Sequence, residues 1–231
     1  MLSHVNMWAA ACLVLTMFSY LCAKVAHRRW GSAWLTPVIA AAAPLIAFLL
    51  LTKIPYTTYF ADTRWLLWLS GPATIAFAIP IYDNRAVVRG HWVSLLAGAI
   101  TSTVVAVTSS IWLAHALSLS TMLQKSLAAR SVTTPMAIAA SQRIGGVPDL
   151  TVLFVMATGL IGILLGDLIL ASLPIRSTLA RGMLWGSAAH TFGSAQARRI
   201  GEQEGVVASL AVVLSGVLTV TIAPLVPVFL H

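Results

Sequence analysis

Six long apolar runs, separated by short polar stretches, dominate the pattern of hydrophobic and polar positions along this chain. Each run has about 20 residues, which as a helix is long enough to cross the hydrocarbon core of a bilayer. The runs cover residues 7–26, 33–52, 65–82, 92–117, 150–173 and 206–230. The pattern therefore predicts an all-α, polytopic membrane protein with about six full spans.

The composition agrees with this pattern. Of the 231 residues, 59% are hydrophobic and only 9% are charged, far from the composition of a soluble domain. The first run has no positive charge before it and Arg28 and Arg29 after it, the reverse of a secretory signal peptide. It is therefore interpreted as a retained helix. Cys12 and Cys22 both lie in it, about 15 Å apart along its axis, which is too far for a disulfide between them.

The net charge of +8 is typical of a membrane protein whose basic residues cluster on cytoplasmic loops. No run of basic residues with interleaved aromatics appears, so nucleic acid is not an expected partner. Two short segments, 126–142 and 180–197, either re-enter the membrane from one side or cross it fully. The re-entrant alternative places Lys24 and four arginine pairs in the cytoplasm, so the charge bias favours it by a small margin. The pairs are Arg28/Arg29, Arg85/Arg89, Arg176/Arg181 and Arg198/Arg199.

An internal repeat follows the first four runs. Arg143-Ile144-Gly145 recurs as Arg199-Ile200-Gly201, at an offset of 56 residues. Each tripeptide follows a short segment rich in alanine, serine and threonine and precedes one long apolar run. A repeated unit with one crossing must reverse its orientation, as in many secondary transporters. We expect residues 1–121 to form the N-terminal part of one membrane domain, and 122–173 and 180–230 to form an inverted repeat. Chance recurrence is the alternative.

The first polar segment is predicted to be a broken helix. Pro135 removes a backbone donor and disfavours a helical Thr134, so the break is expected at Thr133 and Thr134. Non-helical backbone survives in a membrane only where protein or a water-filled cavity covers it. A half-helix that begins near Pro135 would aim its partial positive end at the membrane interior. With the Ser131, Thr133 and Thr134 hydroxyls it would suit a carboxylate.

Two further segments are expected to reach the same site. The second copy carries Gly186 and Gly193 where the first has proline. Its candidate substrate-binding residues are Ser187, His190, Thr191, Ser194 and Gln196. In the segment 70–82, Gly71, Pro72 and Pro80 interrupt an apolar run and could bring Gly71 and Thr74 to the site. Close helix packing, back-bonded hydroxyls and a simple proline kink are the alternatives.

Charged and titratable residues near these segments are the remaining candidates. His190 suits a proton-coupled step because an imidazole titrates near neutral pH, although a hydrogen-bonded packing role is also open. Asp167 lies inside an apolar run, where an ionised aspartate would cost about 2.5 to 3.5 kcal/mol. It is a second proton-coupling candidate, unless it snorkels or is protonated. Arg130, Arg143 and Arg199 flank the polar segments and either attract an anion or only set the topology.

Signatures of enzymes are missing from the sequence. It has no H-E-x-x-H, no G-x-S-x-G, no P-loop and no Cys/His metal spacing. We therefore expect no catalytic residues, no bound metal and no cofactor.

Three blocks of the sequence resemble the LrgB/CidB family of bacterial membrane proteins, which also includes a chloroplast-envelope glycolate/glycerate translocator. The blocks are "GPATIAFAIPIY" from Gly71, "RSVTTPMAIAASQRIGGVPDLT" from Arg130 and "GSAAHTFGSAQARRIGEQEGVVASLA" from Gly186. Three positions depart from the family pattern: Arg130 stands for a usual lysine, Thr191 for glycine and Gln196 for arginine. The resemblance extends over roughly residues 59 to 230.

The resemblance implies two different classes of function. One is transport of short monocarboxylates or hydroxy acids, such as pyruvate, glycolate, glycerate or lactate, across the bacterial cytoplasmic membrane. The other is holin- or antiholin-like control of murein hydrolase activity and lysis. A small LrgA/CidA-like membrane partner and a homo-oligomer are also implied. The paired polar broken segments favour a carrier with alternating access, because a pore or scaffold does not need them.

Overall fold

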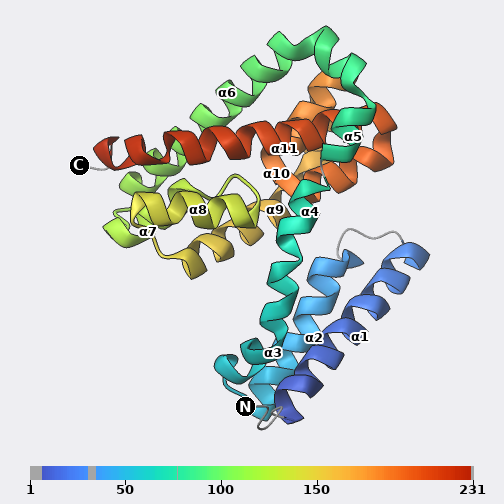
Figure 1. Ribbon diagram of the computed structural model, residues 1–231, viewed down its shortest axis with the longest axis vertical. Helices are drawn as coiled ribbons and strands as arrows, with labels where there is room; N and C mark the ends of the chain where they lie inside the picture. The colour runs from blue at the N-terminus through green and yellow to red at the C-terminus, as the bar shows by residue number, and fades with distance from the viewer. Residues whose placement is uncertain (1–6, 31–34, 77, 230–231) are drawn as a thin grey trace. The chain divides into compact units, whose positions relative to one another are not determined.

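A computed structural model of the chain describes residues 7–30, 35–76 and 78–229, and the regular elements within them are all helical (Figure 1). The helices in chain order are α1 (Met7–Trp30), α2 (Pro37–Thr52), α3 (Tyr56–Trp68), α4 (Ser70–Ile75), α5 (Ala78–Asp83), α6 (Arg85–Ala116), α7 (Thr121–Ala128), α8 (Thr134–Ile144), α9 (Pro148–Ser172), α10 (Thr178–Ile200), α11 (Glu202–Ile222) and the 3₁₀ helix η2 (Ala223–Phe229). The prediction of an all-α protein is confirmed.

Four of the predicted spans are long, apolar helices. Within the described ranges, residues 10–30 and 202–228 and the helices α6 and α9 are long and apolar enough to cross a membrane. The run 33–52 corresponds to the shorter α2, which has 16 residues. The run 65–82 is interrupted, as its glycine and prolines predict, and is divided among the end of α3, α4 and α5. The six expected spans are thus four long helices, one shorter helix and one interrupted segment.

The chain forms two compact units, Met1–Ala73 and Thr74–His231. In the first unit α1 packs against both α2 and α3. The Thr16 and Tyr59 hydroxyl oxygens lie 3.3 Å apart across the α1–α3 contact. Cys12 is buried and Cys22 is exposed, and they form no disulfide with each other, which agrees with their spacing along α1. The second unit contains α5, α6 and the whole repeat region, and within it α6 packs against α7, α10 and α11.

In the second unit α10 is held between α9 and α11. Glycines on all three helices make the close approach possible. A Cβ at Gly186 would meet the Ala208 carbonyl and lie 2.7 Å from the Ala211 Cβ. On α9, a Cβ at Gly166 would collide with the fully buried Trp185 indole. The packing energy of α10 therefore comes from backbone surfaces in direct contact, as is typical of membrane helices.

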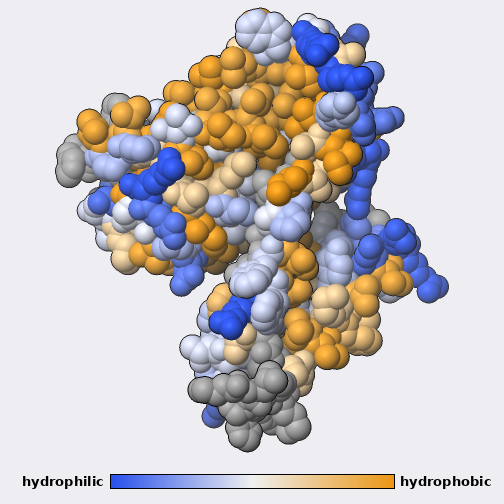
Figure 2. All heavy atoms as spheres, viewed as in Figure 1, coloured by the Kyte–Doolittle hydropathy of each residue, from blue (hydrophilic) through white to orange (hydrophobic). Residues whose placement is uncertain are grey.

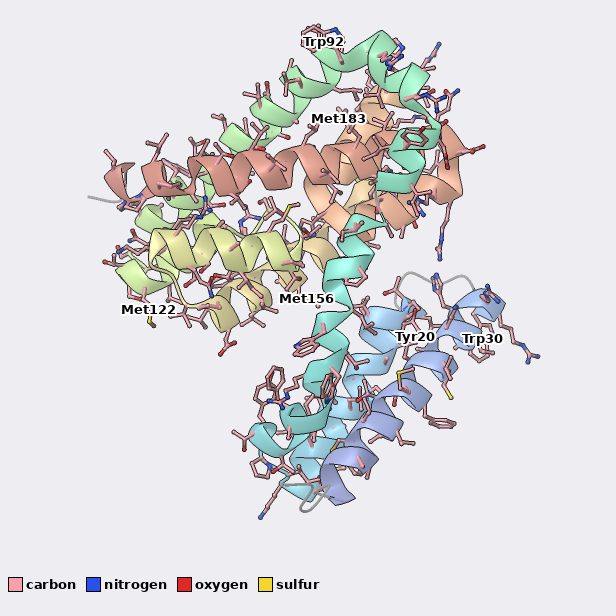
Figure 3. All side chains as sticks on the ribbon, viewed as in Figure 1. Tyr20, Trp30, Trp92, Met122, Met156 and Met183 are labelled. Atoms are coloured by element: carbon pink, nitrogen blue, oxygen red, sulfur yellow. The ribbon has the colours of Figure 1, made fainter. Side chains whose placement is uncertain are left out.

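The outer faces of the second unit are apolar. Figure 2 shows hydrophobic side chains across the face that includes α6 and α11. Exposed Val104 and Val105 on α6 and Leu165 and Leu168 on α9 contribute to these outer faces. Trp92 projects outward near the start of α6, as Figure 3 shows, and is 61% exposed. Exposed apolar area of this extent is what a lipid-facing surface requires.

Candidate functional site

The first repeat contains a break at the predicted position. α7 ends at Ala128 and α8 begins at Thr134, with Pro135 in its first turn. Thr133 caps the helix in an extended conformation, with φ −63° and ψ 147°. Proline is tolerated there because the first amides of a helix have no intrahelical partner. The predicted break is confirmed at Thr133, but Thr134 is already the first residue of α8, which ends at Ile144 and is followed by Gly145 with a left-handed φ of 80°.

The second repeat is broken at His190. This residue has φ 40° and ψ −122° and divides α10 into half-helices 178–189 and 191–200. The expectation that Gly186 and Gly193 open the helix is wrong, because both lie inside the half-helices and serve close packing. A Cβ at Gly193 would collide with the Trp185 carbonyl. A side chain other than glycine at positive φ is strained, by about 1 to 3 kcal/mol.

The two breaks occupy equivalent places in the repeat. The offset of 56 residues aligns Thr134 with His190 and Ser131 with Ser187. Each break is followed by a half-helix that ends at the R-I-G tripeptide and then by a long apolar helix, α9 or α11. The order of broken segment, turn and long helix is therefore present twice. The opposite orientation of the two copies stays a prediction.

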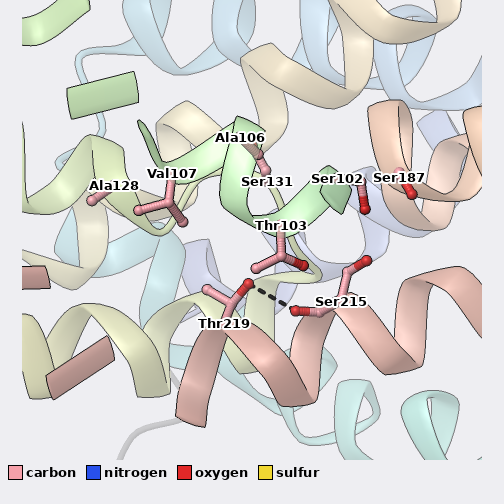
Figure 4. A pocket seen from close by; sticks show the side chains of 9 residues that line it. All are labelled: Ser102, Thr103, Ala106, Val107, Ala128, Ser131, Ser187, Ser215 and Thr219. Atoms are coloured by element: carbon pink, nitrogen blue, oxygen red, sulfur yellow. Dashed lines mark hydrogen bonds between the residues drawn. The ribbon is translucent and has the colours of Figure 1, made fainter. Parts of the chain in front are cut away.

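A small polar cavity lies between the first break and the first half-helix of α10 (Figure 4). Its lining residues come from α6, the end of α7, the first break, α10 and α11: Ser102, Thr103, Ala106, Val107, Ala128, Ser131, Ser187, Ser215 and Thr219. Its volume is about 10 Å³, and one water needs roughly 10 to 15 Å³ by the same measure. The cavity therefore has room for a single water-sized occupant.

Three hydroxyls on this cavity are buried without a hydrogen-bond partner among the described residues: Thr103 Oγ1, Ser187 Oγ and Ser215 Oγ. Two of the other three hydroxyls, those of Ser102 and Thr219, donate to backbone carbonyls of their own helices. Thr219 Oγ1 donates to the Ser215 carbonyl at 2.7 Å (dashed in Figure 4), and Ser102 Oγ donates to the Ala99 carbonyl at 3.0 Å. A buried polar group without a partner costs about 1 to 3 kcal/mol. Three such groups facing one cavity indicate a polar occupant.

Two more unpartnered groups lie at the N-terminal ends of the helical segments that follow the two breaks, α8 and 191–200. Thr133 Oγ1 and His190 Nε2 are buried and have no hydrogen bond to any residue that the structure describes. The two residues are only 4% and 2% exposed. Each stands immediately before a helical segment, α8 or 191–200, whose first amide groups lack intrahelical acceptors.

Arg130 is half-buried at the first break and bonds to two neighbouring helices, and its role in attracting an anion stays a prediction. Its Nε donates to Ser110 Oγ on α6 at 2.9 Å, and its Nη1 donates to Thr158 Oγ1 on α9 at 3.2 Å. The guanidinium also interacts electrostatically with His190. Arg143 and Arg199 are exposed, and Arg143 Nη1 donates to the Val220 carbonyl at 3.2 Å. Arg130 is thus the cation of the three that lies near the two breaks.

Sequence similarity to known proteins shows which family the chain belongs to. Residues 16–229 match the LrgB-like family. The chain belongs to the LrgB-like family. It is 34% identical over 212 residues to the uncharacterized protein YwbG of Bacillus subtilis, covering 92% of this chain and 94% of the relative. A second relative, the uncharacterized protein YxaC of Bacillus subtilis, is 33% identical over 219 residues, 95% of each chain. No solved structure matches.

Several predicted site residues of this LrgB-family chain do not line the cavity. Thr191 is exposed, and its carbonyl accepts a hydrogen bond from Ser194 Oγ at 2.9 Å. Gln196 Nε2 donates to Asp167 Oδ2 at 3.2 Å. This bond ties α10 to α9, and Asp167 is exposed, so the structure gives Asp167 a partner other than His190.

The third predicted segment is described only in part. Gly71 is exposed, and an added Cβ there would meet no atom within 4 Å. The side chain of Thr74 lies outside the described residues. The contribution of this segment to a binding site stays a prediction.

The sequence reasoning missed the four hydroxyls that α6 and α11 contribute to the cavity of this LrgB-family protein. Ser215 and Thr219 are four positions apart and share one face of α11, and Ser102 and Thr103 stand where the apolar run 92–117 is interrupted by "TST". A search for hydroxyl residues within the predicted spans would have found them. They were overlooked because isolated serines and threonines in membrane helices commonly bond back to their own backbone.

Proposed function

We propose that this LrgB-family protein is a secondary carrier of small monocarboxylates or hydroxy acids, of the pyruvate, glycolate, glycerate and lactate class, in the bacterial cytoplasmic membrane. One observation carries the proposal. The two repeats each begin a half-helix at a buried polar group that has no partner among the described residues, Thr133 in one and His190 in the other.

The chemistry of these two ends suits a carboxylate. The start of a helix carries a partial positive charge and unpaired amide donors, which stabilise an anion by about 0.3 to 2 kcal/mol. Thr133 Oγ1 adds a hydroxyl donor. His190 Nε2 adds another when that nitrogen carries its proton. Arg130, held by Ser110 and Thr158, supplies a full positive charge nearby. An anion at this place gains donors, partial charge and a counter-ion together.

The family resemblance supports the size and charge of the substrate, and the paired breaks support alternating access at the repeat interface. A holin- or antiholin-like role in lysis is the competing class. A pore that passes large solutes does not need two half-helix starts with buried, unpartnered side chains. A small LrgA/CidA-like subunit remains a proposed partner, and assembly into a homo-oligomer is proposed with it.

Uptake into proteoliposomes tests the carrier directly. Labelled pyruvate, glycolate, glycerate and lactate are offered to reconstituted protein, with and without a pH gradient and with and without an LrgA/CidA-like subunit. We expect saturable uptake of at least one acid, with Thr133→Val reducing it and Thr108→Val leaving it unchanged. Thr108 is exposed on α6 and bonds only to its own helix. Release of a large entrapped dye, without saturable uptake of any acid, would instead support the holin-like class.

A further inference from the structure

The small cavity has the donor set of a hard cation site. Six hydroxyl oxygens surround it, contributed by Ser102, Thr103, Ser131, Ser187, Ser215 and Thr219. Among the residues that the structure describes, no nitrogen-bearing side chain and no thiol lines the cavity. Hard cations such as Na⁺, Mg²⁺ and Ca²⁺ select oxygen ligands. A site without a carboxylate suits a single positive charge rather than a divalent ion, whose desolvation requires charged ligands.

The cavity lies at the negative ends of two half-helices. Ala128 is the last residue of α7, and Ser187 lies in the last turn of the half-helix 178–189. The last carbonyls of a helix lack intrahelical donors and carry partial negative charge. Helix breaks in transporters use such ends to coordinate Na⁺. Thr133 and His190 stand at the positive N-terminal ends of the half-helices that follow each break. Each break therefore has one end that suits a cation and one end that suits an anion.

The cavity is too small to hold the proposed carboxylate substrate, so its occupant must be a different, smaller species. A volume of about 10 Å³ accepts one water-sized particle. Pyruvate, glycolate, glycerate and lactate each have about five or more heavy atoms and do not fit a space for one water. A dehydrated sodium ion is no larger than a water molecule and does. Ser131 and Ser187, predicted as substrate ligands, therefore line a space that suits a small ion.

We propose that this cavity binds one dehydrated Na⁺ ion. Thr103 Oγ1, Ser187 Oγ and Ser215 Oγ, which have no hydrogen-bond partner within the described part of the chain, turn their lone pairs to the ion. In the carrier function proposed above, on which this step rests, the ion accompanies the carboxylate. One Na⁺ and one monocarboxylate together carry no net charge across the membrane.

Thermal unfolding of the purified protein tests the ion site without any substrate. Melting temperature is measured in NaCl, KCl and choline chloride at equal ionic strength. We expect a saturable rise of about 5 °C in Na⁺ only, because a ligand that binds the folded state stabilises it. Equal melting temperatures in the three salts would overturn the site and leave water as the occupant.

Variants locate the binding. Ser215→Ala and Thr103→Val each remove one hydroxyl and are expected to weaken the apparent Na⁺ affinity at least tenfold. Thr108→Val, on an exposed face of the same helix as Thr103, is the matched control and should keep the wild-type Na⁺ response. If a cavity variant does not fold, the wild-type titration still decides the proposal. A full Na⁺ response in both folded cavity variants would overturn the assignment to this cavity.

Transport separates the ion site from the carrier function. If the protein carries acids, an inward Na⁺ gradient should accelerate uptake and Ser215→Ala should remove the acceleration. A Na⁺-specific rise in melting temperature without uptake of any acid would support the ion site while the carrier function fails. Uptake that ignores Na⁺, together with a melting temperature that ignores Na⁺, would overturn the ion site while the carrier function stands.

Discussion

Ser131 and Ser187, which are 56 residues apart and equivalent in the internal repeat, line the same cavity. One belongs to the break before α8, and the other to the half-helix that ends at His190. Two copies of one motif thus meet at a single polar cavity inside the second unit. The repeat interface is where a membrane transporter places its binding site.

The shared cavity predicts that Ser131 and Ser187 act together. In a double-mutant cycle of Ser131→Ala and Ser187→Ala, we expect a coupling energy of about 0.5 to 3 kcal/mol in Na⁺-dependent stability. Pairing Ser131→Ala with Ser172→Ala provides the control, because Ser172 is exposed and bonds only to the Ile169 carbonyl. This control pair should be additive. Additive behaviour of Ser131 and Ser187 would mean that they do not share an occupant.

His190 combines a strained backbone with an unpartnered imidazole. Comparing its glycine and alanine variants distinguishes the effect of the backbone strain from the effect of losing the imidazole. His190→Gly removes the strain of φ 40°, worth about 1 to 3 kcal/mol, because glycine accepts positive φ. We expect it to fold at least as stably as His190→Ala while both lose acid uptake. His190→Val should be the least stable of the three. Circular dichroism melts and uptake measure the two effects separately, and wild-type uptake by His190→Gly would remove the imidazole from the site.

Arg130 is expected to act through its positive charge. Arg130→Gln removes the charge near the two breaks and should raise the KM for an acid about tenfold or more, since hydrogen bonds to charged groups contribute about 1.5 to 3 kcal/mol. Arg130→Lys keeps the charge and should lower affinity less. Arg143→Gln, at an exposed arginine bonded to the Val220 carbonyl, is the control and should leave the KM unchanged. Equal effects of the lysine and glutamine variants would assign Arg130 to helix positioning.

The break near Pro135 was predictable from the sequence, and the break at His190 was only partly so. Proline removes a donor and restricts the preceding residue, so its effect is local and needs no knowledge of the fold. At His190 the positive φ lies between two half-helices that both pack closely on their neighbours: Gly166 contacts Trp185 in the first, and Gly159 contacts Phe192 in the second. Tertiary contacts of this kind leave no local signal. Gly186 and Gly193 therefore suggested a helix break in the sequence, whereas in the structure they allow close helix packing.

Local sequence patterns predicted the membrane helices and the repeated tripeptide, but they could not predict the cavity. Apolar length and a recurring tripeptide are properties of the chain alone. The cavity forms only when Ser102 and Ser215, which are more than a hundred residues apart in the sequence, are brought together by helix packing. Which hydroxyls face a cavity depends on how these helices pack, because a hydroxyl such as that of Ser102 can line the cavity and still bond back to its own helix.

The contact between α10 and α11 predicts a sharp difference between two glycines. Gly186→Ala places a Cβ against the Ala208 backbone and Ala211, so we expect a loss of about 1 to 3 kcal/mol in stability from overpacking. Gly90→Ala, in α6, meets no atom within 4 Å and should be neutral or slightly stabilising. Melting temperature in detergent measures both variants. Equal stability of the two would mean that α10 and α11 are farther apart than described.

The inverted repeat predicts that the two R-I-G turns face opposite sides of the membrane. A unit of broken segment, turn and one crossing helix reverses its orientation when it is repeated. In a protein with Cys12 and Cys22 replaced by alanine, Gln142→Cys and Glu202→Cys place single thiols at exposed positions beside Arg143 and Arg199. A membrane-impermeant maleimide applied from outside should label one of the two in intact cells and both after permeabilisation. Labelling of both from the same side would show that the repeats are parallel, and the proposed meeting of opposed half-helices would then fail.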